Sequence, residues 1–258
     1  MGILNVTPDS FYDGGRFRNK SSILKQVDTM LDEGATFIDI GAYSSRPGAD
    51  HVSEMEELNR ILPIIEFLVK NFPNILISID TFRSNVAKAC VEAGACMIND
   101  ISAGQQDDNM FATIAELNVP YIMMHMRGTP QTMQKLTDYD DLIKAITHYF
   151  SERIASARAF GIVDLIIDPG FGFAKTLKQN FELLNKLELL KTIDLPILAG
   201  VSRKSMIYKT LDTSAEGALN GTTALHMVAL QKGSSILRVH DVKEAVECVT
   251  LFEQLKSS

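Results

Sequence analysis

Residues 53–80, SEMEELNRILPIIEFLVKNFPNILISID, contain one complete unit of the pattern that decides the fold. In its first part the apolar residues recur at helical spacing; they are Met55, Leu58, Ile61, Leu62, Ile65, Leu68 and Val69. This spacing predicts an amphipathic helix over Ser53–Lys70, and Ser53 with Glu56 has the spacing of a capping box at its start. The helix is followed by Ile75–Asp80, a short apolar run typical of a strand buried in a parallel sheet, which ends on a carboxylate.

The same unit recurs along the chain. The apolar runs are Gly2–Val6, Thr36–Gly41, Ile75–Asp80, Met97–Ile101, Tyr121–Met126, Leu165–Asp168, Pro196–Val201 and Ser235–His240. Amphipathic stretches lie between them, for example Tyr139–Phe160, and a last one, Val242–Leu255, follows them. Eight such units in 258 residues predict an α/β fold, a single (β/α)₈ TIM barrel, with an open doubly wound sheet as the alternative. No linker or shift of composition divides the chain, so we expect one domain over residues 1–258.

The composition excludes several classes of protein. Apolar residues make up 46% of the chain and charged residues 22%, with a net charge of -7, which excludes a disordered, collagen-like or coiled-coil chain. No run approaches the roughly 20 apolar residues that cross a bilayer, and the N-terminus does not resemble a secretory signal. The acidic balance disfavours a nucleic-acid-coating protein, and an odd number of cysteines, 3, is typical of a reducing compartment. We therefore expect a cytoplasmic protein with neither membrane nor nucleic-acid partners.

Polar side chains stand at or just after the carboxyl ends of the apolar runs. They are Asn5, Asp80, Asn99, Asp100, His125, Asp168, Lys204, Arg238 and His240. In a parallel barrel these ends share one face, which is where such enzymes build their sites. Strand ends also become polar simply because they reach solvent, but charged groups are costly to gather without partners. The pattern favours a polar ligand pocket at this face.

Arg238 and His240 are two residues apart on a predicted strand, so their side chains should project from the same face. Two cationic donors side by side suit a dianionic group, and the planar fork of arginine matches phosphate oxygens. A structural ion pair for the arginine is the plain alternative. Lys204 weakens that alternative because a third positive group adds repulsion unless an anion is bound.

Asp80, Asn99 and Asp168 would place two carboxylates and one amide at the mouth of the barrel. A carboxylate can accept two parallel N–H bonds from an amidine-like edge such as that of a guanine or pterin ring, and asparagine adds a donor and an acceptor. A glycosidase acid/base couple or a set of metal ligands would use the same residue types. The distance between the two carboxylates would distinguish a pterin site, a glycosidase couple and a metal site, and the sequence does not give that distance.

Three predicted connections, Thr7–Lys20, Ala42–Val52 and Arg127–Asp138, are longer than usual and rich in Gly, Pro, Ser and Asp. Long polar loops at a barrel mouth can close over substrate, and ordinary surface loops have the same composition. A further stretch, residues 170–175 (GFGFAK), begins like a dinucleotide-binding fingerprint but lacks its third glycine. We do not count it as a cofactor site.

An ordered series of motifs resembles the dihydropteroate synthase family of pterin-binding enzymes. The motifs are residues 1–11 (MGILNVTPDSF), 44–49 (SSRPGA), 79–81 (IDT), 98–100 (IND), 168–173 (DPGFGF), 202–205 (SRKS) and 238–241 (RVHD). They cover essentially the whole chain. The resemblance implies a (β/α)₈ barrel that joins 6-hydroxymethyl-7,8-dihydropterin diphosphate to 4-aminobenzoate, releasing diphosphate and forming 7,8-dihydropteroate for folate synthesis.

The resemblance also implies roles for individual residues. Asp80, Asn99, Asp168 and Lys204 would bind the pterin; Asn5, Ser45, Arg46, Arg238 and His240 the diphosphate; Phe11, Pro47, Phe173, Lys204 and Ser205 the aminobenzoate. Asn5 would also bind Mg²⁺. Asn5, Lys204, Arg238 and His240 would take part in catalysis, with Asp13 or Asp9 steadying a developing cation. A homodimer and inhibition by sulfonamides, which mimic 4-aminobenzoate, are expected on the same ground.

Two departures from the family pattern and two rival functions remain. The chain enters its first predicted strand almost at once, and Ser45 stands where threonine is common in the family. One rival is a methyltetrahydrofolate:corrinoid methyltransferase, which shares the barrel but has no diphosphate to expel. The other is a non-catalytic barrel that only binds a pterin or a partner. The combination of Asn5, Lys204, Arg238 and His240 favours the synthase.

Overall fold

The computed structural model describes residues 1–6, 16–43 and 52–257. In these residues every expected apolar run contains a strand. The strands are β1 (Gly2–Asn5), β2 (Ile38–Gly41), β3 (Ile77–Asp80), β4 (Met97–Asp100), β5 (Tyr121–Met124), β6 (Leu165–Asp168), β7 (Leu198–Ala199) and β8 (Ile236–Leu237). Each strand is followed by one or more helices before the next begins, and the predicted alternation of strand and helix is therefore confirmed.

The strands form a closed ring. β1 to β6 pair in chain order as one parallel sheet, and β7 pairs with β8 in parallel. Isolated parallel bridges join the two parts, Ile167 to Ile197 on one side and Gly2 to Val239 on the other. The Ile3 amide donates to the Val239 carbonyl at 2.9 Å, so the last strand segment lies beside the first. The expected (β/α)₈ barrel is confirmed and the open sheet is excluded.

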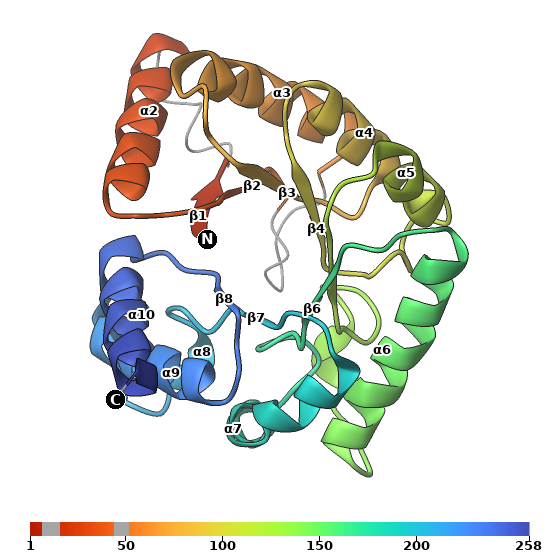
Figure 1. The fold of residues 1–258 in the computed structure, drawn as a ribbon, viewed down its shortest axis with the longest axis vertical. Coiled ribbons are helices and arrows are strands. Elements are labelled where there is room, and N and C mark those ends of the chain that lie inside the picture. Colours follow the sequence, from red (N-terminus) through yellow and green to blue (C-terminus); the bar gives the residue numbers. More distant parts are fainter. Residues whose placement is uncertain (7–15, 44–51, 258) are drawn as a thin grey trace.

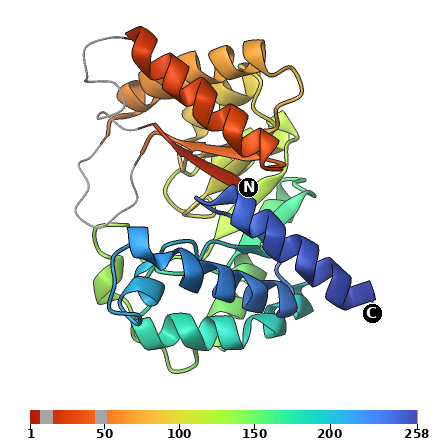
Figure 2. The ribbon, with the colours of Figure 1, turned by 90° about the vertical axis from the view of Figure 1, so that its left-hand side faces the viewer.

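Helices surround this ring of strands, as Figure 1 shows in a view along the barrel. They are α2 (Arg16–Asp32), α3 (Glu54–Asn71), α4 (Ser84–Glu92), α5 (Met110–Leu117), α6 (Leu142–Ala159), α7 (Leu177–Asn185), α8 (Ser205–Tyr208), α9 (Leu219–Gln231) and α10 (Val242–Ser257). Short 3₁₀ turns are η1 (Met133–Lys135), η2 (Leu187–Ile193) and η3 (Glu216–Ala218). The side view in Figure 2 shows α10, in blue, extending away from the N-terminus of the chain. Among the described residues no helix is long and apolar enough to cross a membrane.

Helix α3 shows how far the opening motif specifies local structure. Ser53 caps the helix, and its hydroxyl accepts the Glu56 amide at 3.2 Å. The reciprocal half of the expected capping box does not form, because the Glu56 carboxylate pairs with Arg60 instead. Met55, expected on the buried stripe, is 68% exposed, whereas Glu57 is fully buried. Both residues belong to the first turn, so they differ in direction: Glu57 lies on the face of the helix that is buried, and Met55 lies outside that face.

The interior of the barrel is layered. At the amino end an apolar layer fills the ring; its buried members are Met97, Ile122, Ile166 and Leu198. Side chains alternate along each strand, so Ile38 and Ile40 pack outward under the helices while Asp39, between them, points into the barrel. Above the apolar layer the inward positions become polar. The sequence alternation thus places charged groups in the carboxyl half of the barrel.

Candidate active site

A cluster of ionic contacts fills the carboxyl half of the barrel. Arg238, which follows β8, donates from Nε to the Asp39 carboxylate at 2.6 Å and from one terminal nitrogen to the Asp80 carboxylate at 2.8 Å. Burial alone would lower the pKa of Arg238, but the charges of Asp39 and Asp80 raise it above its ordinary value. The guanidinium therefore stays positive, and it joins β8 to β2 and β3 across the barrel.

Asp39 is the member of this cluster that the sequence analysis missed. Its side chain is fully buried, accepts from the Ser78 hydroxyl at 2.6 Å and from the Asn99 amide at 3.1 Å, and pairs with Arg238. The residue lies in the middle of β2, so a search of strand ends passes over it. A lone carboxylate inside an otherwise apolar run is the signal that points to it, because such a group persists in a core only when it is paired.

Asp80 lies at the end of β3, where its neighbours control its charge. Burial raises the pKa of this carboxyl, with Arg238 opposing that shift and Asp39 adding to it. Gly41 on the adjacent strand leaves room for it, since a Cβ on Gly41 would lie 3.3 Å from the Cβ of Asp80. Asp80 and Asn99 thus stand side by side on paired strands and are joined through Asp39 and Arg238.

Asp168 and Lys204 form the opposite side of the cluster. The Asp168 side chain is 6% exposed, and one of its oxygens accepts the Gly170 amide at 2.8 Å. Burial raises the pKa of Asp168, and the Lys204 charge acts against that shift. Lys204 donates to the Phe171 carbonyl, and burial lowers its pKa to about 8 while Asp168 opposes the change. Each group therefore favours the charged form of the other, against the effect of burial.

Two glycines, Gly172 and Gly200, lie close to the Lys204 side chain. A Cβ on Gly200 would lie 3.8 Å from the Lys204 ammonium nitrogen and 4.0 Å from the Cβ of Arg238. A Cβ on Gly172 would lie 3.4 Å from the Lys204 side chain. An added Cβ would therefore make ordinary contacts with Lys204 at both positions, and it is the φ of 82° at Gly172 that favours glycine there.

His240 lies at the rim, and the expected cationic pair is divided. The Ser202 hydroxyl lies 3.1 Å from His240 Nδ1 and accepts the His240 amide at 3.2 Å. The His240 side chain is exposed, whereas Arg238 turns inward to its two carboxylates. Both residues lie at the same end of the barrel, at different depths. Asn5, at the end of β1, is exposed at this end as well.

Arg203, within the SRKS motif, has a structural role. It forms a two-pronged ion pair with Asp241 at 2.7 and 2.8 Å and donates to the carbonyls of Ala215 and Glu216. Its φ of 51° turns the chain sharply after β7. This pair fastens the loop that carries Lys204 and Ser205 to the segment that carries His240.

An apolar wall borders the charged cluster. Its buried members are Ile101, Met124, Met126, Met133 and Ala174, with Phe82 and Phe173 packed against them. The Lys204 ammonium lies 5.0 Å from the centre of the Phe173 ring. A flat aromatic ligand could lie against this wall while its polar end meets Lys204.

The structure therefore brings together most of the expected site residues that it describes. Asp80, Asn99, Asp168, Lys204 and Arg238 form one cluster with Asp39, Phe173 adjoins it, and Asn5, Ser205 and His240 lie at the same end. Asp13, Phe11, Ser45, Arg46, Pro47 and the alternative Asp9 lie outside the described residues. Among the described residues no group of three or more His, Cys, Asp or Glu side chains could hold a metal ion.

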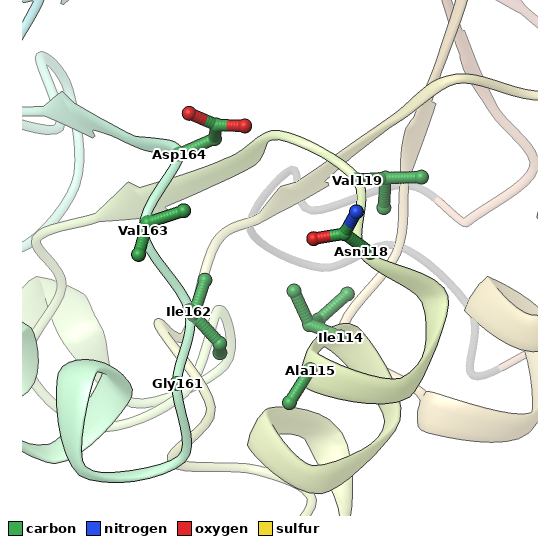
Figure 3. Close-up of a pocket in the computed structure, with 8 residues that line it drawn as sticks. All are labelled: Ile114, Ala115, Asn118, Val119, Gly161, Ile162, Val163 and Asp164. Atoms are coloured by element: carbon green, nitrogen blue, oxygen red, sulfur yellow. The ribbon is translucent and has the colours of Figure 1, made fainter.

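A small pocket lies at the other end of the barrel. Figure 3 shows it between the end of α5 and the segment before β6. It is lined by Ile114, Ala115, Asn118, Val119, Gly161, Ile162, Val163 and Asp164. Asp164 is the one ionisable group in this lining. The pocket therefore lacks the convergent charged groups that the carboxyl end provides, and we place the site at the carboxyl end.

Comparisons with known proteins agree with this geometry. Residues 1–240 match the family model described as pterin binding enzyme. A dihydropteroate synthase of Synechocystis sp. is 46% identical over 99% of this chain and 89% of its own length. The dihydropteroate synthase of Yersinia pestis, solved with a sulfonamide drug, superimposes with a TM-score of 0.93 at 43% identity, covering 100% of this chain and 94% of that one. The Xanthomonas albilineans enzyme, solved with 4-aminobenzoic acid, gives a TM-score of 0.92 at 40% identity over 100% and 93% of the two chains. With its barrel, its clustered motifs and this similarity along nearly its whole length, the chain belongs to the dihydropteroate synthase family of pterin-binding enzymes.

Proposed function

We propose that this chain joins 6-hydroxymethyl-7,8-dihydropterin diphosphate to 4-aminobenzoate, forming 7,8-dihydropteroate and releasing diphosphate. The observation that carries the proposal is the cluster of Asp39, Asp80, Asp168, Lys204 and Arg238 inside the barrel mouth. Its carboxylates can accept hydrogen bonds from the N–H edge of a pterin. Its cations, Lys204 and Arg238, would lie next to the diphosphate attached to that pterin. The relatives that carry the synthase name support the same reading.

The pterin ring enters the deepest polar layer. Among the described residues only one carboxylate oxygen of Asp168 has a hydrogen-bond partner, the Gly170 amide, so the other carboxylate oxygen can accept from the ring. The Asn99 side-chain nitrogen donates to Asp39, which fixes this amide beside the same layer. Both groups are fixed by their neighbours before substrate binds, and such preorganisation reduces the entropy lost on binding.

The diphosphate lies toward the rim. Arg238 places positive charge below it and His240 contributes donors from the exposed side, while Ser45 and Arg46 complete the set by resemblance. Negative charge grows on the diphosphate as the methylene–oxygen bond breaks. One preorganised donor aimed at such charge is worth about 3–4 kcal/mol in the barrier.

Magnesium fits this end of the barrel as a companion of the diphosphate. Mg²⁺ prefers oxygen ligands and is commonly held by one or two protein groups together with phosphate oxygens and waters. The Asn5 side chain offers one amide oxygen at the rim, and the described residues contain no complete protein cage for a metal. Bound there, Mg²⁺ would neutralise charge on the leaving group.

The chemical step needs no nucleophile from the protein. The methylene–oxygen bond breaks and its electron pair leaves with diphosphate, and the electron-rich dihydropterin carries the resulting positive charge, steadied by Asp13 or Asp9. The amine of 4-aminobenzoate then donates its lone pair to the methylene and releases a proton. Phe173, Lys204 and Ser205 hold the aminobenzoate for this attack. The amine is already a free base, so no strong general base is required.

Assembly and location are part of the same proposal. We expect a homodimer, which sedimentation of the purified chain would test. We expect a cytoplasmic location, because the odd number of cysteines is typical of proteins in a reducing compartment and because of the proposed pterin substrates.

One reaction tests the function. Purified protein is mixed with Mg²⁺, the pterin diphosphate and 4-aminobenzoate, and dihydropteroate is measured by chromatography. We expect product that depends on both substrates and an apparent KM for aminobenzoate that rises with added sulfonamide. Tight pterin binding without product would support the non-catalytic alternative. Methyl transfer from methyltetrahydrofolate to a corrinoid would support the methyltransferase.

A further inference from the structure

We propose that Lys175 is a positioning residue that holds the loop after β6 in its active shape, an inference that rests on the proposed synthase function. Lys175 lies in the glycine-rich stretch after Asp168 and has no role in the chemistry described above. Its side chain is 5% exposed. A lysine so deeply buried needs partners, and those partners identify what it does.

The Lys175 ammonium nitrogen has three polar contacts. It donates to the Gly170 carbonyl at 2.9 Å and to the Phe173 carbonyl at 3.0 Å, and it lies 3.0 Å from Nδ1 of His125. The loop thus winds around the end of this one side chain. His125 belongs to the segment after β5, so the same contact fastens the loop to the neighbouring strand.

The three hydrogen bonds can form whether the proton is on Lys175 or on His125. An ammonium group donates to both carbonyls and to Nδ1, whereas a neutral amine donates to the carbonyls and accepts from a protonated Nδ1. Burial lowers the pKa of Lys175 to about 7, with Asp168 opposing, and burial also lowers the pKa of His125. The hold on the loop therefore does not depend on which of the two nitrogens carries the proton.

The loop contains one residue in an unfavourable backbone conformation. Ala174 has a φ of 47°, which a residue with a Cβ rarely adopts, whereas Gly170 and Gly172 have φ values of 72° and 82° that glycine adopts without strain. The Tyr139 hydroxyl donates to the Ala174 carbonyl at 3.0 Å and the Gly172 amide donates to Asn180 at 2.6 Å. Lys175 adds the contacts to residues 170 and 173, which these bonds leave out.

Two parts of the proposed site depend on the loop to different degrees. Asp168 is the last residue of β6, and its carbonyl accepts the His125 amide at 2.8 Å, so the strand itself helps to hold it. Phe173 lies five residues beyond the strand, in the part whose carbonyl Lys175 holds. Loss of Lys175 should therefore disturb Phe173, which is proposed to contact the aminobenzoate, more than Asp168, which is proposed to bind the pterin.

Charge supports the same assignment. Three carboxylates, the buried Asp39 and Asp168 and the partly exposed Asp80, face the two cations Arg238 and Lys204. The charge of Lys175 also acts on Asp168, so it adds a third positive group from beneath the loop when it is protonated. The site is then balanced before the anionic substrates arrive.

The test compares Lys175→Met, which keeps the length of the side chain but removes its donors, with Lys178→Met, an exposed lysine at the start of α7. For each folded protein we would measure kcat, the KM for 4-aminobenzoate, the dissociation constant of the pterin and the thermal midpoint. We expect Lys175→Met to raise the KM for aminobenzoate and lower kcat by about tenfold or more, while pterin binding changes less than about threefold. Lys178→Met should match the wild type.

His125→Phe is the second variant, because it removes one partner of Lys175 and keeps a ring against Tyr149, whose ring centre is 4.8 Å away. In His125→Phe the KM for aminobenzoate and kcat should again change more than the dissociation constant of the pterin, but all changes should be smaller. This variant tests the proposal if Lys175→Met does not fold. Unchanged kinetics, or equal losses in pterin binding and aminobenzoate KM, would overturn the inference. A wild type without turnover would instead defeat the proposed function, so the two failures are distinguishable.

Discussion

Arg238 and Asp39 are 199 residues apart in the chain, yet the Nε of the arginine lies 2.6 Å from a carboxylate oxygen of the aspartate. Asp39 is fully buried and comes from β2, while Arg238 follows β8. The contact crosses the interior of the barrel, and it orients the guanidinium whose other arm holds Asp80. The arginine that we propose to bind the anion is thus positioned by a carboxylate that we do not expect to touch substrate.

The first prediction concerns this pair. Asp39→Asn keeps the shape of the side chain but removes its charge, which leaves Arg238 with one carboxylate partner. Removing one partner of a buried ion pair typically costs about 3–5 kcal/mol, and the remaining Asp80 contact should place the loss in free energy of unfolding at about 3 kcal/mol. We also expect kcat/KM to fall about 100-fold, because the guanidinium is no longer fixed from two sides. Urea unfolding and steady-state kinetics measure the two effects.

Asp28→Asn is the matched control, since Asp28 is exposed on α2. It should change neither quantity. An Asp39→Asn protein as stable and as active as the wild type would show that Arg238 does not need its second carboxylate. Arg238→Ala should likewise lose stability as well as activity, because the buried Asp39 and the partly exposed Asp80 would both lose their cationic partner.

The second prediction concerns pH. Burial lowers the pKa of Lys204 to about 8, with Asp168 opposing, so the ammonium group loses its proton as the pH rises through that value. Because the charged form is the one that attracts anionic substrates, kcat/KM should decline above about pH 8 by about tenfold per pH unit. Lys204→Arg retains its charge throughout this range and should lack that decline, at a lower overall rate.

Lys209→Arg, at an exposed lysine just after α8, is the matched control and should keep the decline of the wild type. Circular dichroism over the same pH range separates loss of charge from loss of fold. An unchanged decline near pH 8 in Lys204→Arg would assign it to another group.

How much of this site the sequence predicts depends on whether the signal is local. The sequence points to Asp80, Asn99 and Asp168 because each lies at or near the carboxyl end of an apolar run, and a parallel barrel brings all such ends to one face. Asp39 was missed because it interrupts a run instead of ending it, and its partner becomes a neighbour only when the ring closes. The order of the strands follows from the alternation of strands and helices along the chain. Which charged side chains pair inside the barrel depends on how far along the barrel axis each one lies, and the alternation of strands and helices does not give that position.

Two smaller differences have similar causes. Lys175 stood in a glycine-rich stretch that we considered only as a cofactor motif, and its burial depends on the positive φ values of the loop around it. Met55 is exposed although Glu57, in the same first turn of α3, is fully buried. With about 100° of rotation per residue Met55 lies at the edge of the apolar stripe and Glu57 lies nearer the centre of the buried face. Periodicity alone gives that inward position to an apolar residue, and the partners that keep Glu57 there, Thr81 and Arg83, come from a distant part of the chain.

The third prediction concerns His226 on α9. Its side chain is 1% exposed, and among the described residues neither ring nitrogen has a hydrogen-bond partner. Burial lowers its pKa to about 4, whereas the unfolded chain binds the proton near pH 6.5. The unfolded state therefore takes up the proton first as the pH falls, and stability is lost between about pH 6.5 and pH 4.

His226→Leu should remove this acid-dependent loss. Relative to the wild type, its free energy of unfolding should gain about 2 kcal/mol between pH 7 and pH 5, as read from urea unfolding at both values. His148→Gln, at an exposed position on α6, is the control and should show no such gain. A constant difference between His226→Leu and the wild type would mean that His226 takes up a proton in the folded state as readily as in the unfolded state.

The last prediction compares two glycines with similar backbone angles. Gly170 has a φ of 72°, and a Cβ there would lie 2.1 Å from the His125 carbonyl oxygen. Gly161 has a φ of 89°, and no atom lies within 4 Å of the position of its Cβ. Gly161→Ala should therefore cost only the backbone strain of about 1–2 kcal/mol. Gly170→Ala adds a clash with a backbone atom of the neighbouring strand segment and should cost about 3 kcal/mol or more.

Activity should separate the two variants further. The Gly170 amide donates to the Asp168 carboxylate at 2.8 Å, and the Gly170 carbonyl accepts from Lys175. Displacement of Gly170 should therefore disturb both Asp168, proposed to bind the pterin, and Lys175, proposed to hold the loop that carries Phe173. We expect Gly170→Ala to lose most of its turnover at a temperature where it remains folded, and Gly161→Ala to retain the turnover of the wild type. Equal losses in stability and activity for the two variants would mean that the loop after β6 relaxes around the added methyl group. The close approach of Gly170 to His125 would then not be a requirement of the site.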